Sequence, residues 1–214
     1  MKNRFWDANE AFEYYLDHIR QFGWKTDVGT KKISNVGFYI TNPTKNEIRT
    51  PERKWSKEYA EAEWQWYLSG DRKISKLGEM YGKVPVIWEK MANSAGEVNS
   101  NYGWQWERKD QIDYVVSELK ANPSSRRAAI SIYDGKEWPQ YRKDTPCTFA
   151  IHFSIASGHL NMTVMMRSND LWFGFCNDQY CFSELQKMIA ERLSIPVGEY
   201  YHFVCDLHLY EKHL

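Results

Sequence analysis

The sequence predicts one α+β domain, and three observations favour this class. Helix-like and strand-like segments both occur along the 214 residues, but they do not alternate strictly, as they would in a parallel α/β sheet. Two strand-like runs are joined by the short loop Ser157-Gly158-His159, which is typical of an antiparallel hairpin. The chain is 43% hydrophobic and has no linker-like segment, so residues 1–214 can bury one substantial core.

The first half of the chain carries two predicted helices and a strand. Apolar side chains occur at helical spacing over residues 8–22, and Gly23 is a residue common at helix ends. Residues 32–41 are rich in β-branched and aromatic residues, which predicts a strand. Ser56 can cap a helix over residues 56–68, because its hydroxyl can accept from backbone N–H groups of the first turn.

The second half begins with a helix at residues 111–120. This helix ends before Pro123, because proline disfavours helical geometry in the residue before it. In chain order, the elements predicted after it are a strand at 128–133, a hairpin at 147–156 and 160–167, a helix at 177–193 and a strand at 200–205.

Charge and cysteine content limit the classes of partner. Lys plus Arg equals Asp plus Glu at 28 each, so the chain has no global positive field that would hold nucleic acid. No apolar run resembles a signal peptide or reaches the ~18 residues that cross a bilayer. We therefore expect a cytoplasmic protein without a membrane partner. The cysteines lack C-x-x-C spacing, so we expect free thiols and no metal site at Cys147, Cys176, Cys181 and Cys205.

Cys147 is a candidate nucleophile, although a single free cysteine is more often a small buried hydrophobic residue. Polar and charged segments elsewhere in the chain complement it. Arg126-Arg127 lies upstream, residues 167–170 (Arg-Ser-Asn-Asp) lie downstream, and residues 206–210 (Asp-Leu-His-Leu-Tyr) follow near the end. Together they supply a nucleophile, arginines that can bind a phosphate, and partners for hydroxyl groups.

These segments, in this order and spacing, resemble thymidylate synthases and their relatives, which modify pyrimidine nucleotides at ring position 5. The resemblance runs from about Glu63 to Leu214 and includes the Glu-Trp-Gln-Trp-Tyr-Leu-Ser-Gly-Asp segment at 63–71. Tyr-Gly-Trp-Gln-Trp at 102–106 and Asn-Pro-Ser-Ser-Arg-Arg at 122–127 also match. The resemblance implies a mixed sheet packed with helices, with one sheet face at a homodimer interface.

The resemblance also implies a role for each candidate residue. The Cys147 thiolate, stabilised by Arg167, would add to ring carbon 6, and carbon 5 would then attack the methylene group of the co-substrate 5,10-methylenetetrahydrofolate. Glu63 would organise water and proton transfer, with Tyr102 beside it in the catalytic set. The implied substrate contacts are Arg126 and Arg127 from the neighbouring subunit, Arg167, Ser168, His208 and Tyr210; the implied folate contacts are Asp170, Trp66 and Trp88.

Without the resemblance, plainer interpretations stay open for three of these residues. His208 and Tyr210 fit an ordinary pair of strand residues with one polar tip, and Glu63 fits a partly exposed carboxylate on a helix.

Asp178 departs from the thymidylate synthase pattern in an informative way. It stands where those enzymes use an asparagine to read uracil. An asparagine amide both donates and accepts, whereas an ionised aspartate only accepts, which suits the 4-amino group of cytosine beside a protonated ring nitrogen. Asn177 reads the base instead if the alignment shifts by one residue.

Asp178, residues 96–104 and Cys147-Thr148 together resemble the bacteriophage deoxycytidylate hydroxymethylases. In those enzymes water traps the methylene intermediate, so the predicted activity is 5-hydroxymethylation of dCMP, in a host cytoplasm if the gene belongs to a phage. A dUMP methyltransferase, a cytidylate methyltransferase, a CMP hydroxymethylase and a non-catalytic nucleotide-binding relative stay open. We expect the usual C-terminal extension to be missing, and residues 29–32 to be either a phosphate-binding substitute or a solvated turn.

Overall fold

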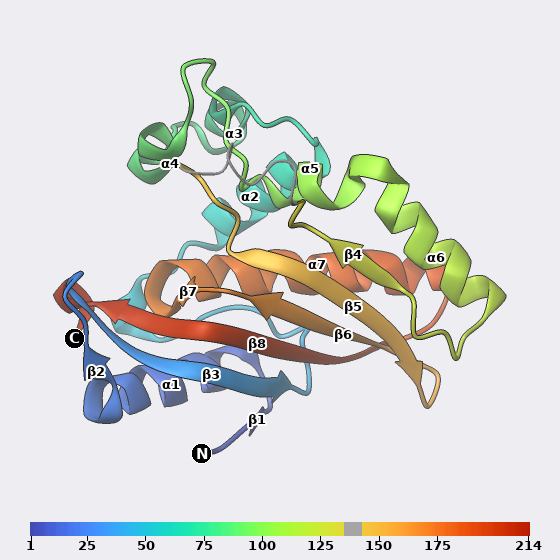
Figure 1. Ribbon diagram of the computed structural model, residues 1–214, viewed down its shortest axis with the longest axis horizontal. Helices are drawn as coiled ribbons and strands as arrows, with labels where there is room; N and C mark the ends of the chain where they lie inside the picture. Colours follow the sequence, from blue (N-terminus) through green and yellow to red (C-terminus); the bar gives the residue numbers. More distant parts are fainter. Residues whose placement is uncertain (135–142) are drawn as a thin grey trace.

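The computed structural model describes residues 1–134 and 143–214 (Figure 1). In these residues, eight strands form one mixed sheet with the main order β1-β3-β8-β6-β5-β4, while β2 pairs with β3 and β7 pairs with β8. The strands are β1 (Arg4–Phe5), β2 (Trp24–Lys25), β3 (Thr30–Ile40), β4 (Ala129–Ser131), β5 (Thr148–Ala156), β6 (His159–Met166), β7 (Asn169–Asp170) and β8 (Val197–Tyr210).

The helices lie along the sheet and above one of its edges. Figure 1 shows α7 running along the sheet, while α3 and α4 lie at the top of the view, away from the strands. The helices are α1 (Ala8–Phe22), α2 (Lys57–Leu68), α3 (Ile74–Tyr81), α4 (Val86–Met91), α5 (Tyr102–Glu107), α6 (Gln111–Ala121) and α7 (Cys176–Leu193). A π-helical turn (Leu171–Phe175) leads directly into α7, and short 3-10 turns lie at Pro51–Arg53, Arg108–Asp110 and Glu211–His213.

The predicted α+β class is confirmed, and each predicted helix and strand has a counterpart within a few residues. Ser56 caps α2 as expected, since its hydroxyl accepts from the backbone N–H of Tyr59 at 3.1 Å. Gly23 follows α1, but its φ of −65° shows no left-handed cap. Glycine is needed there for space, because a Cβ would approach the carbonyl oxygen of Ile19 to 2.7 Å.

Two parts of the prediction need correction. The helices α3, α4 and α5 were not predicted, and none of them is long enough for a repeated apolar pattern to stand out. The last strand is much longer than residues 200–205, because β8 continues to Tyr210 along β3. As a consequence, Asp206 and His208 lie on the central strand of the sheet.

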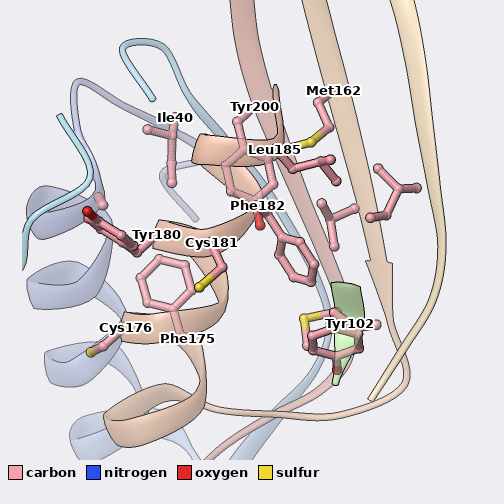
Figure 2. Packing of buried hydrophobic residues seen from close by; sticks show 14 of the residues in the cluster. Ile40, Tyr102, Met162, Phe175, Cys176, Tyr180, Cys181, Phe182, Leu185 and Tyr200 are labelled. Carbon is pink, nitrogen blue, oxygen red and sulfur yellow. The ribbon is translucent and has the colours of Figure 1, made fainter. Parts of the chain in front are cut away.

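The core lies between α7 and the sheet. Figure 2 shows Phe182 and Leu185 of α7 beside Tyr200 of β8 and Met162 of β6. All four side chains are almost completely buried, which fixes the position of α7 and of its first turn relative to β8.

The opposite face of the sheet carries half-buried side chains that include Met165, Tyr201 and Phe203. This alternation follows from strand geometry, since neighbouring residues point to opposite faces. The family resemblance implies that one sheet face forms a dimer interface, and that assignment stays a prediction. In the described part of the chain, no helix combines the length and apolar character needed to cross a membrane.

Candidate active site

Cys147 lies directly before β5 and is half-buried. Its backbone N–H and that of Thr148 both donate to the hydroxyl of Tyr102 at 3.2 Å. Tyr102 opens α5, and Asn101 caps that helix by accepting from the backbone N–H of Trp104 at 2.9 Å. The start of α5 therefore holds the backbone that carries the candidate nucleophile.

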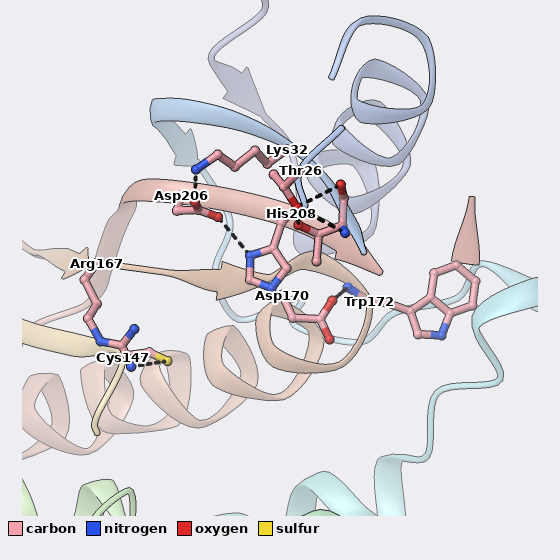
Figure 3. A network of polar contacts seen from close by, with 9 residues as sticks. Thr26, Lys32, Cys147, Arg167, Asp170, Trp172, Asp206 and His208 are labelled. Atoms are coloured by element: carbon pink, nitrogen blue, oxygen red, sulfur yellow. Dashed lines mark hydrogen bonds and ion pairs between the residues drawn. The ribbon is translucent and has the colours of Figure 1, made fainter. Parts of the chain in front are cut away.

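Arg167 approaches Cys147 from the end of β6. Its Nη2 lies 3.7 Å from Sγ of Cys147. Figure 3 shows the two side chains pointing toward each other. The guanidinium also donates to the carbonyl oxygens of Thr145 at 2.7 Å and Pro146 at 3.2 Å. Because β5 and β6 form a hairpin around Ser157 and Gly158, the residues at their far ends meet, and this contact follows from the strand pairing.

The Cys147 thiol is harder to ionise than the family resemblance implies. Burial raises its pKa to about 11, Arg167 lowers it, and the nearby Asp178, Asp144 and Asp170 raise it. Burial and the acidic neighbours therefore outweigh the single arginine. In this state the thiol is protonated at neutral pH.

Glu63 is a buried carboxyl on α2, with 3% of its surface exposed. Tyr59 lies one turn earlier on the same helix and donates its hydroxyl to Oε1 of Glu63 at 3.0 Å. Nε1 of Trp88 donates in turn to the Tyr59 hydroxyl at 2.9 Å. Burial and, second, the charge of Asp178 raise the pKa of Glu63 to about 8, while Tyr59 and Tyr67 oppose the shift. Glu63 therefore holds a proton at neutral pH and can exchange it.

Asp178 lies in the first turn of α7 and is half-buried. Nδ2 of Asn169 donates to its Oδ2 at 2.7 Å. Burial raises the pKa of Asp178 to about 7, the Asn169 hydrogen bond lowers it, and Asp170 raises it further. Its charge also acts on Cys147 and on Glu63, so these three groups form one electrostatic cluster.

Asn177, the alternative reader of the base, is held by a different part of the chain. Its Oδ1 accepts from Nε1 of Trp55 at 2.9 Å. Trp55 precedes α2, whereas the charge of Asp178 acts on Cys147. The geometry therefore brings Asp178 toward the candidate nucleophile.

The predicted sugar and folate groups meet where β7 pairs with β8. In this register Asp170 lies opposite His208. Asp170 accepts from the backbone N–H groups of Trp172 at 3.0 Å and Phe173 at 3.3 Å, which caps the π-helical turn. Burial raises the pKa of Asp170, while the Trp172 hydrogen bond and His208 lower it.

Nδ1 of His208 lies 3.0 Å from Oδ1 of Asp206, and Asp206 also pairs with Lys32 of β3 (Figure 3). A proton on Nδ1 leaves Nε2 of His208 as an acceptor for a hydroxyl group. Tyr210 is exposed and its ring meets that of His208 edge-on at 5.5 Å. Ser168 is half-buried and directly follows Arg167.

Three predicted site residues lie elsewhere in the single chain. Arg126 and Arg127 are exposed before β4, and Arg127 pairs with Glu118 at 2.8 Å. Ala129 pairs with His152 of β5. At about 3.3 Å per residue, this pairing puts the arginines roughly 20 Å from Cys147. They therefore do not reach Cys147 of their own chain.

Trp66 is the third, because its side chain is fully buried and its ring packs against Trp88 at 5.3 Å between centroids. In this conformation it has no surface that a folate could contact.

Sequence reasoning missed two residues that touch the cluster. Tyr59 is one helical turn from Glu63, and this spacing was the signal that could have revealed its contact. Asn169 stands inside the Arg-Ser-Asn-Asp segment, but its contact with Asp178 depends on the π-helical turn between them, which has no sequence signal that we recognise.

The sequence of this chain is similar to a known family and to two known enzymes. Residues 11–214 match the family described as Thymidylate synthase. Deoxycytidylate 5-hydroxymethyltransferase of Enterobacteria phage T4 is 36% identical over 172 residues, which cover 73% of this chain and 68% of that protein. Thymidylate synthase of Bacillus mojavensis is 29% identical over 178 residues, which cover 78% of this chain and 61% of that enzyme.

A solved structure shares the fold. Thermostable thymidylate synthase A from Bacillus subtilis superposes with a TM-score of 0.80 at 24% identity, covering 96% of this chain and 80% of that one. The predicted thymidylate synthase-like fold is thereby confirmed. With a family match over nearly the whole sequence, this chain belongs to the thymidylate synthase family of transferases.

Proposed function

We propose that this protein is a cytoplasmic deoxycytidylate 5-hydroxymethyltransferase, which converts dCMP to 5-hydroxymethyl-dCMP. The observation that carries the proposal is Asp178, a carboxyl group where thymidylate synthases have an asparagine. Burial raises the pKa of Asp178 to about 7, so at neutral pH it exchanges a proton readily. The 36% identity to the phage T4 hydroxymethyltransferase supports the same function.

A carboxyl group that titrates near neutrality suits cytosine better than uracil. One oxygen accepts from the 4-amino group, while the other shares a proton with ring nitrogen 3. Uracil presents an acceptor at position 4, which would face the ionised carboxylate of Asp178. Leaving a buried polar group unpaired costs about 1–3 kcal/mol, so Asp178 is expected to select dCMP over dUMP.

Cys147 is the proposed nucleophile. Because burial keeps its thiol protonated, the proton passes from Sγ to solvent water as the bond from Sγ to ring carbon 6 forms. The electron pair of the C5=C6 bond shifts toward nitrogen 3, which takes the proton of Asp178, and carbon 5 becomes nucleophilic. Arg167, 3.7 Å from Sγ, stabilises the negative charge that develops on sulfur.

Glu63 is the proposed acid and base for the later steps. Carbon 5 must lose its hydrogen and the one-carbon unit must separate from tetrahydrofolate, the leaving group. Water must then add to that unit, and the sulfur must leave carbon 6. Because burial raises the pKa of Glu63 to about 8, its ionised form is a stronger base than an ordinary glutamate. The hydrogen bond from Tyr59 holds this carboxyl in one orientation.

We propose methylenetetrahydrofolate as the co-substrate, which supplies the one-carbon unit when bound. Asp170 and Trp88 fit this role, since both are half-buried and Asp170 lies beside the predicted sugar site. Trp66 does not fit, because its side chain is fully buried.

We also propose a homodimer in which the second copy supplies Arg126 and Arg127 to the nucleotide phosphate. Exposure of these arginines, far from Cys147 of their own chain, supports this arrangement. Arginine suits the task because its planar guanidinium pairs with two phosphate oxygens at once. The remaining proposed contacts are Arg167 and Ser168 with the phosphate, and His208 and Tyr210 with the sugar hydroxyl.

The test is to incubate the protein with methylenetetrahydrofolate and dCMP, dUMP or CMP, and to identify the product by mass. We expect 5-hydroxymethyl-dCMP. A methylated dUMP product would assign thymidylate synthase activity instead. Binding of dCMP without exchange of the hydrogen at ring position 5 would identify a non-catalytic nucleotide-binding relative.

A further inference from the structure

We propose that Trp88 and Tyr59 are positioning residues that fix the direction of a hydrogen-bond chain into Glu63, so that Oε1 stays an acceptor and Oε2 carries the exchangeable proton. The inference rests on the proposed function, because Glu63 is the group that acts as acid and base there. Its evidence is a pair of hydrogen bonds that join α4 to α2.

The chain consists of two hydrogen bonds. Nε1 of Trp88 donates to the hydroxyl oxygen of Tyr59 at 2.9 Å, and that hydroxyl donates to Oε1 of Glu63 at 3.0 Å. Tyr59 and Glu63 are one turn apart on α2, so the second bond follows from helix geometry. Trp88 reaches this pair from α4, and its ring packs against that of Trp66 at 5.3 Å between centroids. This packing helps to hold the indole N–H in place.

The indole decides the direction of the chain. An indole N–H can only donate, so the Tyr59 oxygen must be the acceptor in the bond from Trp88. The hydroxyl hydrogen of Tyr59 then points away from the indole, toward Oε1 of Glu63. A proton on Oε1 would turn this hydrogen away from its acceptor, and an unpaired buried donor is costly. The exchangeable proton of Glu63 therefore belongs on Oε2.

Without the indole donor, the same hydroxyl could reverse its role. A phenol both donates and accepts, so Tyr59 alone could accept from protonated Glu63 as readily as it donates to the ionised form. A reversible partner of this kind would stabilise both forms of the carboxyl group. A fixed donor stabilises only the ionised form, which is the form that acts as a base. Trp88 therefore acts on Glu63 through Tyr59.

Glu63 titrates among groups from its own helix and from α7. Burial is the largest cause of its raised pKa of about 8, and the charge of Asp178 on α7 adds to it. Tyr59 and Tyr67 of α2 lie one turn before and after Glu63, and both lower its pKa. Burial and then the charge of Glu63 raise the pKa of Cys181 on α7. The Tyr59 donor thus keeps the pKa of Glu63 from rising further.

Removing this donor should make the ionised form of Glu63 scarcer at neutral pH. The Tyr59 hydrogen bond lowers the pKa of Glu63, so Tyr59→Phe should raise that pKa by about one unit. The ionised fraction at neutral pH then falls about tenfold, and the rate of product formation should fall with it. The rate should recover as the pH rises, because the carboxyl group then ionises again.

The experiment follows the protonated carboxyl group of Glu63 by its infrared C=O stretch, as the pH of the free protein is raised. The band that disappears in Glu63→Gln identifies this residue. In Tyr59→Phe we expect the midpoint to move up by about one pH unit. Trp88→Phe keeps Tyr59 but removes the indole donor, so we expect a smaller shift in the same direction.

The two substitutions should not be additive. Because Trp88 acts through Tyr59, the double variant should titrate like Tyr59→Phe alone. Tyr81→Phe is the matched control, since the Tyr81 ring packs edge-on against Tyr59 at 5.1 Å but its hydroxyl is no part of the chain. It should leave the midpoint unchanged. Trp88 is also a proposed folate contact, so its variant is judged by the infrared band and not by turnover.

This inference and the proposed function can fail separately, because the infrared titration needs neither nucleotide nor co-substrate. An unchanged midpoint in Tyr59→Phe, or shifts that add in the double variant, would overturn the inference. If Tyr59→Phe does not fold, the midpoint of Trp88→Phe decides in the same way. If the midpoints move as expected but Glu63→Gln forms product at the wild-type rate, the chain stands and the proposed role of Glu63 falls.

Discussion

The base-facing and phosphate-facing halves of the predicted site are built in different ways. Around Asp178, groups from distant segments meet in one enclosed cluster, and burial raises the pKa of Asp178, Glu63 and Cys147 alike. The predicted phosphate ligands Arg126 and Arg127 instead lie on an exposed edge of the sheet. The cluster around Asp178 is the enclosed half of the predicted site, and the two arginines are its exposed half. One chain therefore brings together the groups proposed to act on the pyrimidine, while the predicted phosphate ligands Arg126 and Arg127 lie apart from them.

Removing the nucleophile tests the enclosed half most severely. Cys147→Ala should lower tritium release from dCMP by at least about a thousandfold, because no covalent adduct can form. Binding of dCMP, measured by calorimetry, should persist. Cys205→Ala is the control, since Cys205 is also a half-buried free thiol and lies on β8. Full activity in Cys147→Ala would remove the nucleophile assignment.

The exposed half is tested by Arg127→Ala. Loss of a charged hydrogen bond to phosphate should reduce kcat/KM for dCMP by roughly 10- to 100-fold. Stability should change little, because the pair of Arg127 with Glu118 is exposed on the arginine side.

Mixing Arg127→Ala with Cys147→Ala chains then separates the two halves. Hybrid dimers would contain one site with both an intact cysteine and an intact partner arginine, which should restore about a quarter of wild-type activity at equal mixing. If fluorescence confirms subunit exchange and no activity returns, the phosphate site lies within one chain.

Asp178→Asn tests base selection inside the enclosed half. The amide regains a donor for the 4-oxygen of uracil, so the ratio of kcat/KM for dCMP to that for dUMP should fall by at least about tenfold. An unchanged ratio would mean that Asp178 does not read the base.

The enclosed half should also make the fold sensitive to pH. Burial raises the pKa of Glu63 from 4.5 to about 8. Between these values the unfolded chain has released a proton that the folded chain still holds, so the free energy of unfolding falls as pH rises through this window. Glu63→Gln should lessen that fall, by an amount on the order of 1 kcal/mol or more, in urea titrations at pH 5 and pH 8. Equal slopes in both proteins would show that Glu63 ionises normally.

The parts of the molecule that depend on local patterns could be predicted from the sequence. The cap at Ser56, the hairpin and the position of Glu63 follow from spacing within single elements. The ionisation of Cys147 could not be predicted, because burial and three aspartates, two of them from other segments, oppose Arg167. The bond between Asn169 and Asp178 depends in the same way on a π-helical turn and on the space at Gly174.

The position of β8 has a consequence for how the protein folds as it is synthesised. This strand lies between β3 and β6, yet it is the last of the eight to leave the ribosome. Thr30 of β3 pairs with Tyr210, so one of the longest strand pairings joins residues near opposite ends of the sequence. Such distant pairing is intrinsically slow, and until β8 emerges β3 has a large part of its ladder unpaired. Nascent chains should therefore expose an edge that invites aggregation, and shelter by a chaperone should matter most while β8 is being synthesised.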